Sequence, residues 1–141
     1  MSETTQTSSP RVQDLYRRAA TARGNSYAPY SRCHVGAAIR LSDGSVFTGS
    51  NVENSSFGAT ICAERSAIVA AVSAVGTIEI VEVMVVTDAP SPWPPCGLCR
   101  QVIAEFGPHC TVYAANTAGD ILTLPFEELY THPFGPEQMH R

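Results

Sequence analysis

The stretch TICAERSAIVAAV, residues 60–72, constrains the fold of this chain more than any other segment. Between Cys62 and Val75 the only charged residues are Glu64 and Arg65, and both lie in the first turn of a predicted helix. The rest of that helix is apolar nearly all round, and a helix of this kind is buried on several sides. The sequence therefore predicts a layered fold in which other elements cover this helix.

The surrounding sequence alternates between helical and strand patterns. Ser9 and Pro10 supply the N-cap and first residue of a helix that ends near Gly24. The turn SDGS at 42–45 joins two strand patterns into a β-hairpin. Further strands are predicted at 78–88, 110–116 and 121–124, with a helix at 97–106 and a short one after Pro125. This order predicts a three-layer α/β/α sandwich with helices on both faces of one sheet.

The length of the chain limits the number of domains, and its charge limits the classes of binding partner. With 141 residues and 44% hydrophobic content, the chain fits one domain, expected at 10–141 after a disordered polar tail at 1–9 that lacks a secretory signal. A net charge of −4 without any Lys/Arg-rich run argues against nucleic acid and anionic membranes as partners. No uncharged apolar run reaches the roughly 18 residues of a membrane-spanning helix. We therefore expect a cytoplasmic protein whose five cysteines stay reduced, for metal binding, catalysis or burial.

Three of the cysteines stand where helices are predicted to begin. Cys96 and Cys99 lie three residues apart and so share one helix face, while Cys62 begins the helix described above. Helix N-termini favour the thiolate, which is the form that binds metal. Three protein ligands with one open position are typical of catalytic zinc, and a nearby carboxylate such as Glu64 would then be a general base. The joint pattern Cys62-x-Glu64 and Pro95-Cys96-x-x-Cys99 fits the zinc-deaminase signature.

Three segments carry a family resemblance: SYAPYSRCHVGAA, GSNVENSSFGATICAERSAI and PPCGLCRQVIAEFGP resemble the small homotetrameric cytidine deaminases that act on free nucleosides. The resemblance implies a mixed central sheet and hydrolysis of cytidine and 2′-deoxycytidine to uridine and 2′-deoxyuridine, with release of ammonia, in pyrimidine salvage. It also implies a homotetramer with its sites at subunit interfaces.

The resemblance also implies roles for individual residues. One zinc ion per chain is held by Cys62, Cys96 and Cys99, with Glu64 as the proton shuttle and Arg65 hydrogen-bonded to the ligand thiolates. Asn51 and Glu53 hydrogen-bond the ribose 3′-hydroxyl. The remaining substrate contacts are Ala63, Phe57 and Phe134, the last reaching a neighbouring subunit's site.

Two departures from the family lie near the expected base-binding region. Cys33 stands where the family usually has phenylalanine, and Pro94 stands where it commonly has serine. They favour, as an alternative, a deaminase of a modified cytosine nucleoside or a nucleoside antibiotic. Taken alone, Cys33 and Cys110 have no partner in the sequence and are predicted to be small buried hydrophobes. Trp93 is predicted to pack or to anchor its loop.

Two alternatives belong to other functional classes. WPPCGLC after a strand also suits a Cys-x-x-Cys thiol oxidoreductase, but that reading leaves Cys62 and Glu64 unexplained. A non-catalytic zinc module would need a fourth protein ligand, and no residue has suitable spacing for it.

Overall fold

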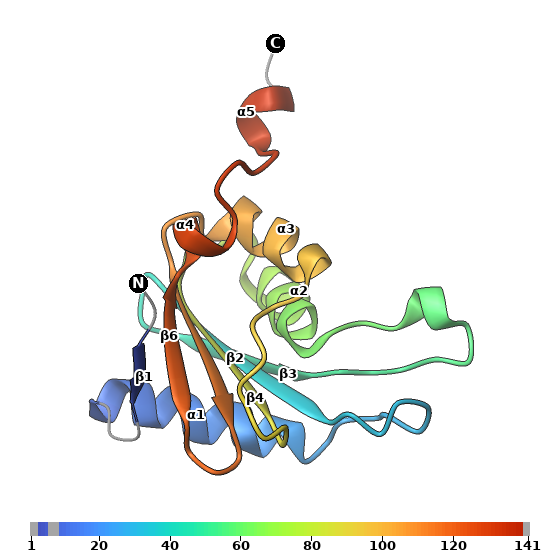
Figure 1. Ribbon diagram of the computed structural model, residues 1–141. Helices are drawn as coiled ribbons and strands as arrows, with labels where there is room; N and C mark the ends of the chain where they lie inside the picture. Colours follow the sequence, from blue (N-terminus) through green and yellow to red (C-terminus); the bar gives the residue numbers. More distant parts are fainter. Residues whose placement is uncertain (1–2, 6–8, 140–141) are drawn as a thin grey trace.

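The computed structural model describes residues 3–5 and 9–139, which form one mixed sheet between two layers of helices (Figure 1). The sheet has the order β1-β6-β5-β4-β2-β3, and β4 and β5 are parallel while the other neighbours are antiparallel. Its strands are β1 (Glu3–Thr5), β2 (Val35–Leu41), β3 (Val46–Ser50), β4 (Ile80–Thr87), β5 (Thr111–Asn116) and β6 (Ile121–Pro125). The predicted α/β/α sandwich is confirmed.

The helix α1 (Pro10–Arg23) covers one face of the sheet. The Ser9 hydroxyl accepts a hydrogen bond from the Val12 amide at 3.4 Å, which caps the helix as the sequence predicts. Leu15 and Ala19 are fully buried on the sheet side, against residues of β2, β4 and β5. The spacing of these residues is that of one helix face, so α1 is an ordinary amphipathic helix.

The helices α2 (Ala63–Val75) and α3 (Gly97–Phe106) cover the other face. Ala67, Ile68 and Ala71 of α2 pack into the larger core cluster, which also contains residues of β2, β4 and α3. At Gly49 in β3 the strand comes so close to α2 that an added Cβ would lie 2.8 Å from the Ala63 carbonyl oxygen. The start of α2 is therefore held directly against the sheet.

The outer side of α2 differs from the prediction of burial on several sides. Val69 and Val75 are 50% and 58% exposed, and Ala70 and Ala74 are exposed beside them. Within the described residues, no element of the same chain covers this apolar stripe. The uncharged composition of a helix predicts that its apolar side chains are buried. It does not show whether residues of the same chain or of another copy bury them.

The segment before α1 also differs from the predicted tail. Glu3–Thr5 form β1, an antiparallel edge strand that pairs with β6, while residues 1–2 and 6–8 of that tail lie outside the described part of the chain. After β6 the chain forms two short helices, α4 (Phe126–Leu129) and α5 (Pro136–Met139), and α5 projects from the body of the molecule (Figure 1). No described helix is both long and apolar enough to cross a membrane.

Candidate active site

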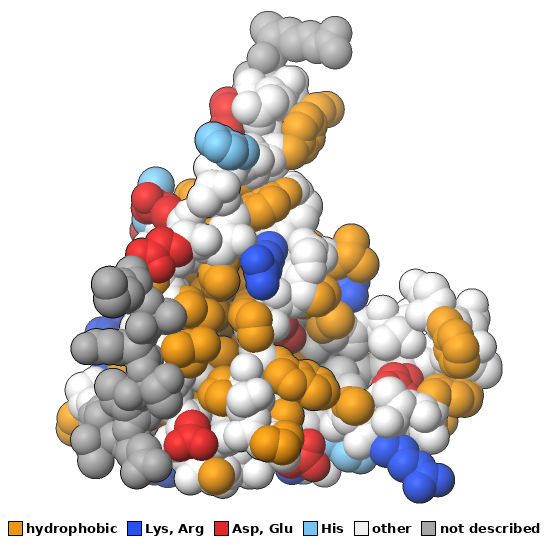
Figure 2. All heavy atoms as spheres, in the orientation of Figure 1, with side chains coloured by type: hydrophobic (Ala, Val, Ile, Leu, Met, Phe, Trp, Pro, Cys, Tyr) orange, Lys and Arg blue, Asp and Glu red, His pale blue; other side chains and the backbone are white. Residues whose placement is uncertain are grey.

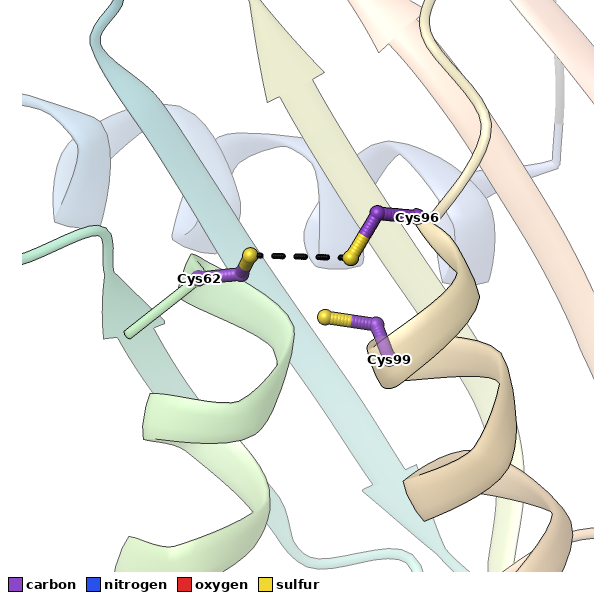
Figure 3. A group of neighbouring side chains, drawn as sticks. All are labelled: Cys62, Cys96 and Cys99. Atoms are coloured by element: carbon purple, nitrogen blue, oxygen red, sulfur yellow. Dashed lines mark hydrogen bonds between the residues drawn. The ribbon is translucent and has the colours of Figure 1, made fainter. Parts of the chain in front are cut away.

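The N-termini of α2 and α3 bring three thiols together (Figure 3). Cys62 and Cys96 are the N-cap residues of the two helices, neither side chain caps its own helix, and Cys99 lies in the first turn of α3. The three Sγ atoms lie within 4.8 Å of one another, and the Cys62 and Cys96 sulfurs are 3.7 Å apart. Tetrahedral zinc with Zn–S bonds of about 2.3 Å places its sulfurs about 3.8 Å apart, so the cluster fits zinc.

The Cys62 sulfur is the acceptor of the hydrogen bonds in this cluster. The Cys99 thiol and the Arg65 guanidinium both donate to the Cys62 sulfur, with Arg65 Nη2 at 3.5 Å, and they lower the pKa of Cys62 to about 5. The same pairing with the Cys62 thiolate raises the pKa of Cys99. A ready thiolate is therefore present at neutral pH, and Arg65 stands beside it as the resemblance implies.

Glu64 projects from the first turn of α2 into the protein interior. Its side chain is buried, and burial raises the pKa of its carboxyl group to about 7, with a smaller contribution from the negative charge on Cys62. A carboxyl group with a pKa near the working pH can both accept and return a proton. Glu64 is thus suited to proton transfer, whereas an exposed glutamate would stay ionised.

A cavity of about 200 Å³ opens beside Glu64 and the thiols. It is mostly apolar, with polar groups at a few positions, which is the usual character of small-molecule sites. The lining residues are Cys33, Val35, Asn51, Thr60, Ile61, Cys62, Ala63, Glu64, Val85, Thr87, Trp93, Pro94 and Cys96.

Asn51, at the end of β3, borders the cavity and holds the preceding loop. Its Oδ1 accepts hydrogen bonds from the Val35 amide at 2.9 Å and from the Ser26 hydroxyl, and its Nδ2 donates to the Cys33 carbonyl at 2.7 Å. The structure therefore places Asn51 at the wall of the cavity, where it also fixes the backbone on which Cys33 stands.

Glu53 lies outside this cavity. Its carboxylate accepts hydrogen bonds from the Tyr30 amide at 3.0 Å, the Ser31 amide at 3.1 Å and the Ser31 hydroxyl, and the bonds from Ser31 lower its pKa most. It lines a neighbouring hollow together with Tyr30, Ser31, Phe57 and Thr60. Thr60 lines both spaces, so the two hollows adjoin.

The two predicted phenylalanines do not line the cavity of the single chain. Phe57 is 73% exposed on the arm between β3 and α2, where it makes an edge-to-face contact with Tyr30 at 5.7 Å. Phe134 is 56% exposed, and its carbonyl oxygen accepts a hydrogen bond from Gln101 at 2.8 Å. The structure thus gathers the zinc ligands, Glu64, Arg65, Ala63 and Asn51, and leaves Glu53, Phe57 and Phe134 apart.

The family resemblance puts Cys33 near the base-binding region, but the residues taken alone predict neither Cys33 nor Trp93 at the cavity wall. Cys33 is half-buried at the cavity, whereas Cys110 is buried in the core as predicted, where burial raises its pKa to about 12. Trp93 also lines the cavity, although the sequence suggested a packing role. Its place three residues before Cys96 is the one sequence signal that relates it to the metal ligands.

Comparison with known proteins agrees with this geometry. Residues 10–115 match the family model described as the cytidine and deoxycytidylate deaminase zinc-binding region. The cytidine deaminase of Halalkalibacterium halodurans is 47% identical over 129 residues, covering 91% of this chain and 97% of that protein. A crystal structure of cytidine deaminase from Burkholderia pseudomallei superposes with a TM-score of 0.82 at 40% identity, covering 86% of this chain and 98% of that chain.

A more distant relative has a different named substrate. The blasticidin-S deaminase of Bacillus cereus is 33% identical over 104 residues, covering 68% of this chain and 73% of that protein. The family match and the identity to relatives over nearly their full length, together with the three-thiol cluster, lead to one conclusion: the chain belongs to the cytidine and deoxycytidylate deaminase family.

Proposed function

We propose that this protein is a zinc-dependent enzyme that hydrolyses cytidine and 2′-deoxycytidine to uridine and 2′-deoxyuridine, with release of ammonia. The observation that carries the proposal is the convergence of Cys62, Cys96 and Cys99 beside the buried Glu64 in one base-sized cavity. The named activity of the relatives, cytidine deamination, supports the same reaction.

Zinc held by the three cysteines would make a water molecule in the cavity nucleophilic near neutral pH. Glu64 accepts a proton from the attacking water and delivers it to ring nitrogen N3 of cytosine, which makes C4 more electrophilic. Glu64 then carries the second proton of that water to the departing amine, so that ammonia leaves and C4 keeps the oxygen. Arg65 donates to the Cys62 sulfur, which reduces the excess negative charge of three thiolates around the metal.

The whole nucleoside would occupy the two adjoining hollows, with the base in the first and the ribose reaching the second. Ala63 lines the cavity for the base, and the ribose extends past Asn51 and Thr60 towards Glu53. Glu53 already accepts three hydrogen bonds, and an ionised carboxylate has about four acceptor positions, so it can also accept one from the ribose 3′-hydroxyl. Phe57 lines the same second hollow and can contact the sugar.

The proposal includes a homotetramer with sites at the subunit interfaces, into which Phe134 of one copy reaches. Support comes from the uncovered apolar stripe on α2 and from the apolar side chains exposed on the arm between β3 and α2 and across the face seen in Figure 2. Size-exclusion chromatography with light scattering tests this part, and a monomeric mass would contradict it. A cytoplasmic location is supported by the five cysteines, all in the described part of the chain, which form no disulfide, as expected in a reducing compartment. Conversion of free cytidine to uridine would give the protein a place in pyrimidine salvage.

The experiment is a substrate panel with zinc-loaded protein. Cytidine, deoxycytidine and several modified cytosine nucleosides are incubated separately, and the loss of cytosine absorbance is followed together with ammonia release. Turnover of the plain nucleosides is the expected result. Turnover of a modified nucleoside alone would contradict the proposed substrate and identify Cys33 and Pro94 as residues to examine first.

A further inference from the structure

The loop between β4 and α3 holds Trp93 in a stiff, extended backbone. Trp93 lies between Pro92 and Pro94 in the sequence SPWPP. Proline fixes its own φ near −65° and restricts the residue before it to extended conformations, so both sides of Trp93 are constrained. The loop is therefore ordered before any ligand arrives, which lowers the entropy cost of binding.

Two hydrogen bonds fasten this loop to the body of the protein. Asn116 at the end of β5 donates its Nδ2 to the Pro90 carbonyl at 3.2 Å, and Arg100 in α3 donates its Nε to the Pro95 carbonyl at 2.8 Å. These anchors lie on either side of Trp93. The backbone at Trp93 is consequently fixed relative to Cys96, the first residue after the loop and a predicted zinc ligand.

The indole borders the cavity without a partner of its own. Among the residues that line the cavity Trp93 is the only aromatic one, and its side chain is 44% exposed. Within the described part of the chain, no hydrogen bond or ring contact engages it. By comparison, the exposed Tyr30 and Phe57 rings pack against each other. A loop anchor would be packed into the protein, whereas a large flat apolar surface left open at a cavity suits a planar ligand.

We propose that Trp93 provides the aromatic surface on which the pyrimidine ring of the substrate stacks. The inference rests on the proposed deamination of a cytosine nucleoside. Stacking on Trp93 holds the plane of the ring while its C4 edge meets Glu64, which lines the same cavity. Trp93 therefore contributes to binding, and Glu64 contributes to proton transfer.

The first test uses the fluorescence of the protein itself. Trp93 is the only tryptophan in the chain, so tryptophan emission reports on this cavity alone. Uridine, the product, is titrated into zinc-loaded protein. We expect a saturable change in emission, with a half-maximal concentration equal to the constant at which uridine inhibits cytidine deamination.

The second test separates aromatic stacking from mere bulk. Trp93→Val is expected to raise KM for cytidine, and the inhibition constant of uridine, by roughly 5- to 150-fold, since base–aromatic stacking has this strength. The kcat value should change far less, because Glu64 and the thiols are untouched. Trp93→Phe is the matched control and should recover most of the affinity. Circular dichroism and zinc content verify that both variants fold.

The outcomes distinguish this inference from the proposed function. A wild-type protein that deaminates cytidine but shows no fluorescence response to saturating uridine overturns the role of Trp93 alone. Unchanged KM in Trp93→Val, or equal losses in the Val and Phe variants, also overturns it. Emission that depends on protein concentration and not on uridine would place Trp93 between copies of the chain and overturn the inference. Absence of cytidine turnover in the wild type would instead contradict the proposed function, and the stacking role with it.

Discussion

Replacing Gly49 by alanine tests how the fold positions the metal site. Gly49 in β3 packs against the first turns of α2, and an added Cβ would lie 2.8 Å from both the Ala63 carbonyl oxygen and the Ser66 Cβ, and closer still to the Ala67 amide. Ordinary contact begins at 3.4 Å, so the start of α2 must move by more than about half an ångström. Most of the obstructing atoms belong to the helix backbone and cannot rotate away.

This displacement acts directly on the zinc site, because Cys62 is the N-cap of α2 while Cys96 and Cys99 belong to α3. Metal–ligand distances tolerate only about 0.2 Å. We expect Gly49→Ala to lower the free energy of unfolding by about 1–3 kcal/mol through overpacking. Zinc affinity should fall at least about tenfold, as it does when supporting contacts of a metal site are disturbed.

Chelator competition measures the zinc affinity, and denaturant unfolding measures the stability. Gly58→Ala is the matched control, because Gly58 lies on the exposed arm and an added Cβ there has no neighbour within 4 Å. A Gly49→Ala protein with the zinc affinity and stability of the wild type would show that the contact of β3 with α2 at Gly49 does not position Cys62. Equal losses in Gly58→Ala would show that the losses do not come from that contact.

Three further predictions follow from the charges and burial of single side chains. Glu64→Gln should keep its zinc yet lose roughly 10²- to 10⁴-fold in kcat, and near-normal turnover would contradict the proton-shuttle role. In metal-free native protein, iodoacetamide with peptide mass spectrometry should find Cys62 modified before Cys110, whose pKas are about 5 and about 12; the reverse order would contradict the described charges. Burial raises the pKa of Glu82, but hydrogen bonds from Arg40 and Arg11 outweigh it and hold that pKa below its usual 4.5. The stability from these bonds is therefore present above pH 4.5 and lost as pH falls through the lower folded-state value, so wild-type stability should drop more steeply in acid than that of Glu82→Gln, and parallel curves would contradict this.

The parts of the site that the sequence predicts are those fixed by local geometry. A cysteine at a helix start, or two cysteines three residues apart, determines where the thiols point before any tertiary contact is known. The fold class follows similarly from the order of helical and strand patterns, and the turn at 42–45 joins β2 and β3 as expected. Local geometry does not predict that the N-termini of α2 and α3 lie side by side, because the rest of the fold positions the two helices.

The remaining features depend on packing between distant segments. Glu53 turns towards Tyr30 and Ser31 because their amides offer hydrogen bonds, which no pattern around Glu53 itself reveals. The pairing of β1 with β6 joins residues more than a hundred positions apart. Burial of the exposed apolar stripe on α2 depends on whether several copies of the chain associate. Trp93 reaches the cavity through a proline-rich loop, whose course no periodic pattern predicts.

Zinc-dependent deamination is tested most directly when zinc content and cytidine turnover are measured on the same samples. Zinc is removed stepwise with a chelator and then restored, in the wild type and in Cys99→Ser, which lacks one ligand. We expect one zinc per chain in the fully loaded wild type and a deamination rate proportional to zinc occupancy, recovered when zinc returns. In Cys99→Ser we expect weakened zinc binding. Turnover that persists after the zinc is gone, or full zinc occupancy without any release of ammonia from cytidine, would contradict zinc-dependent deamination by this protein.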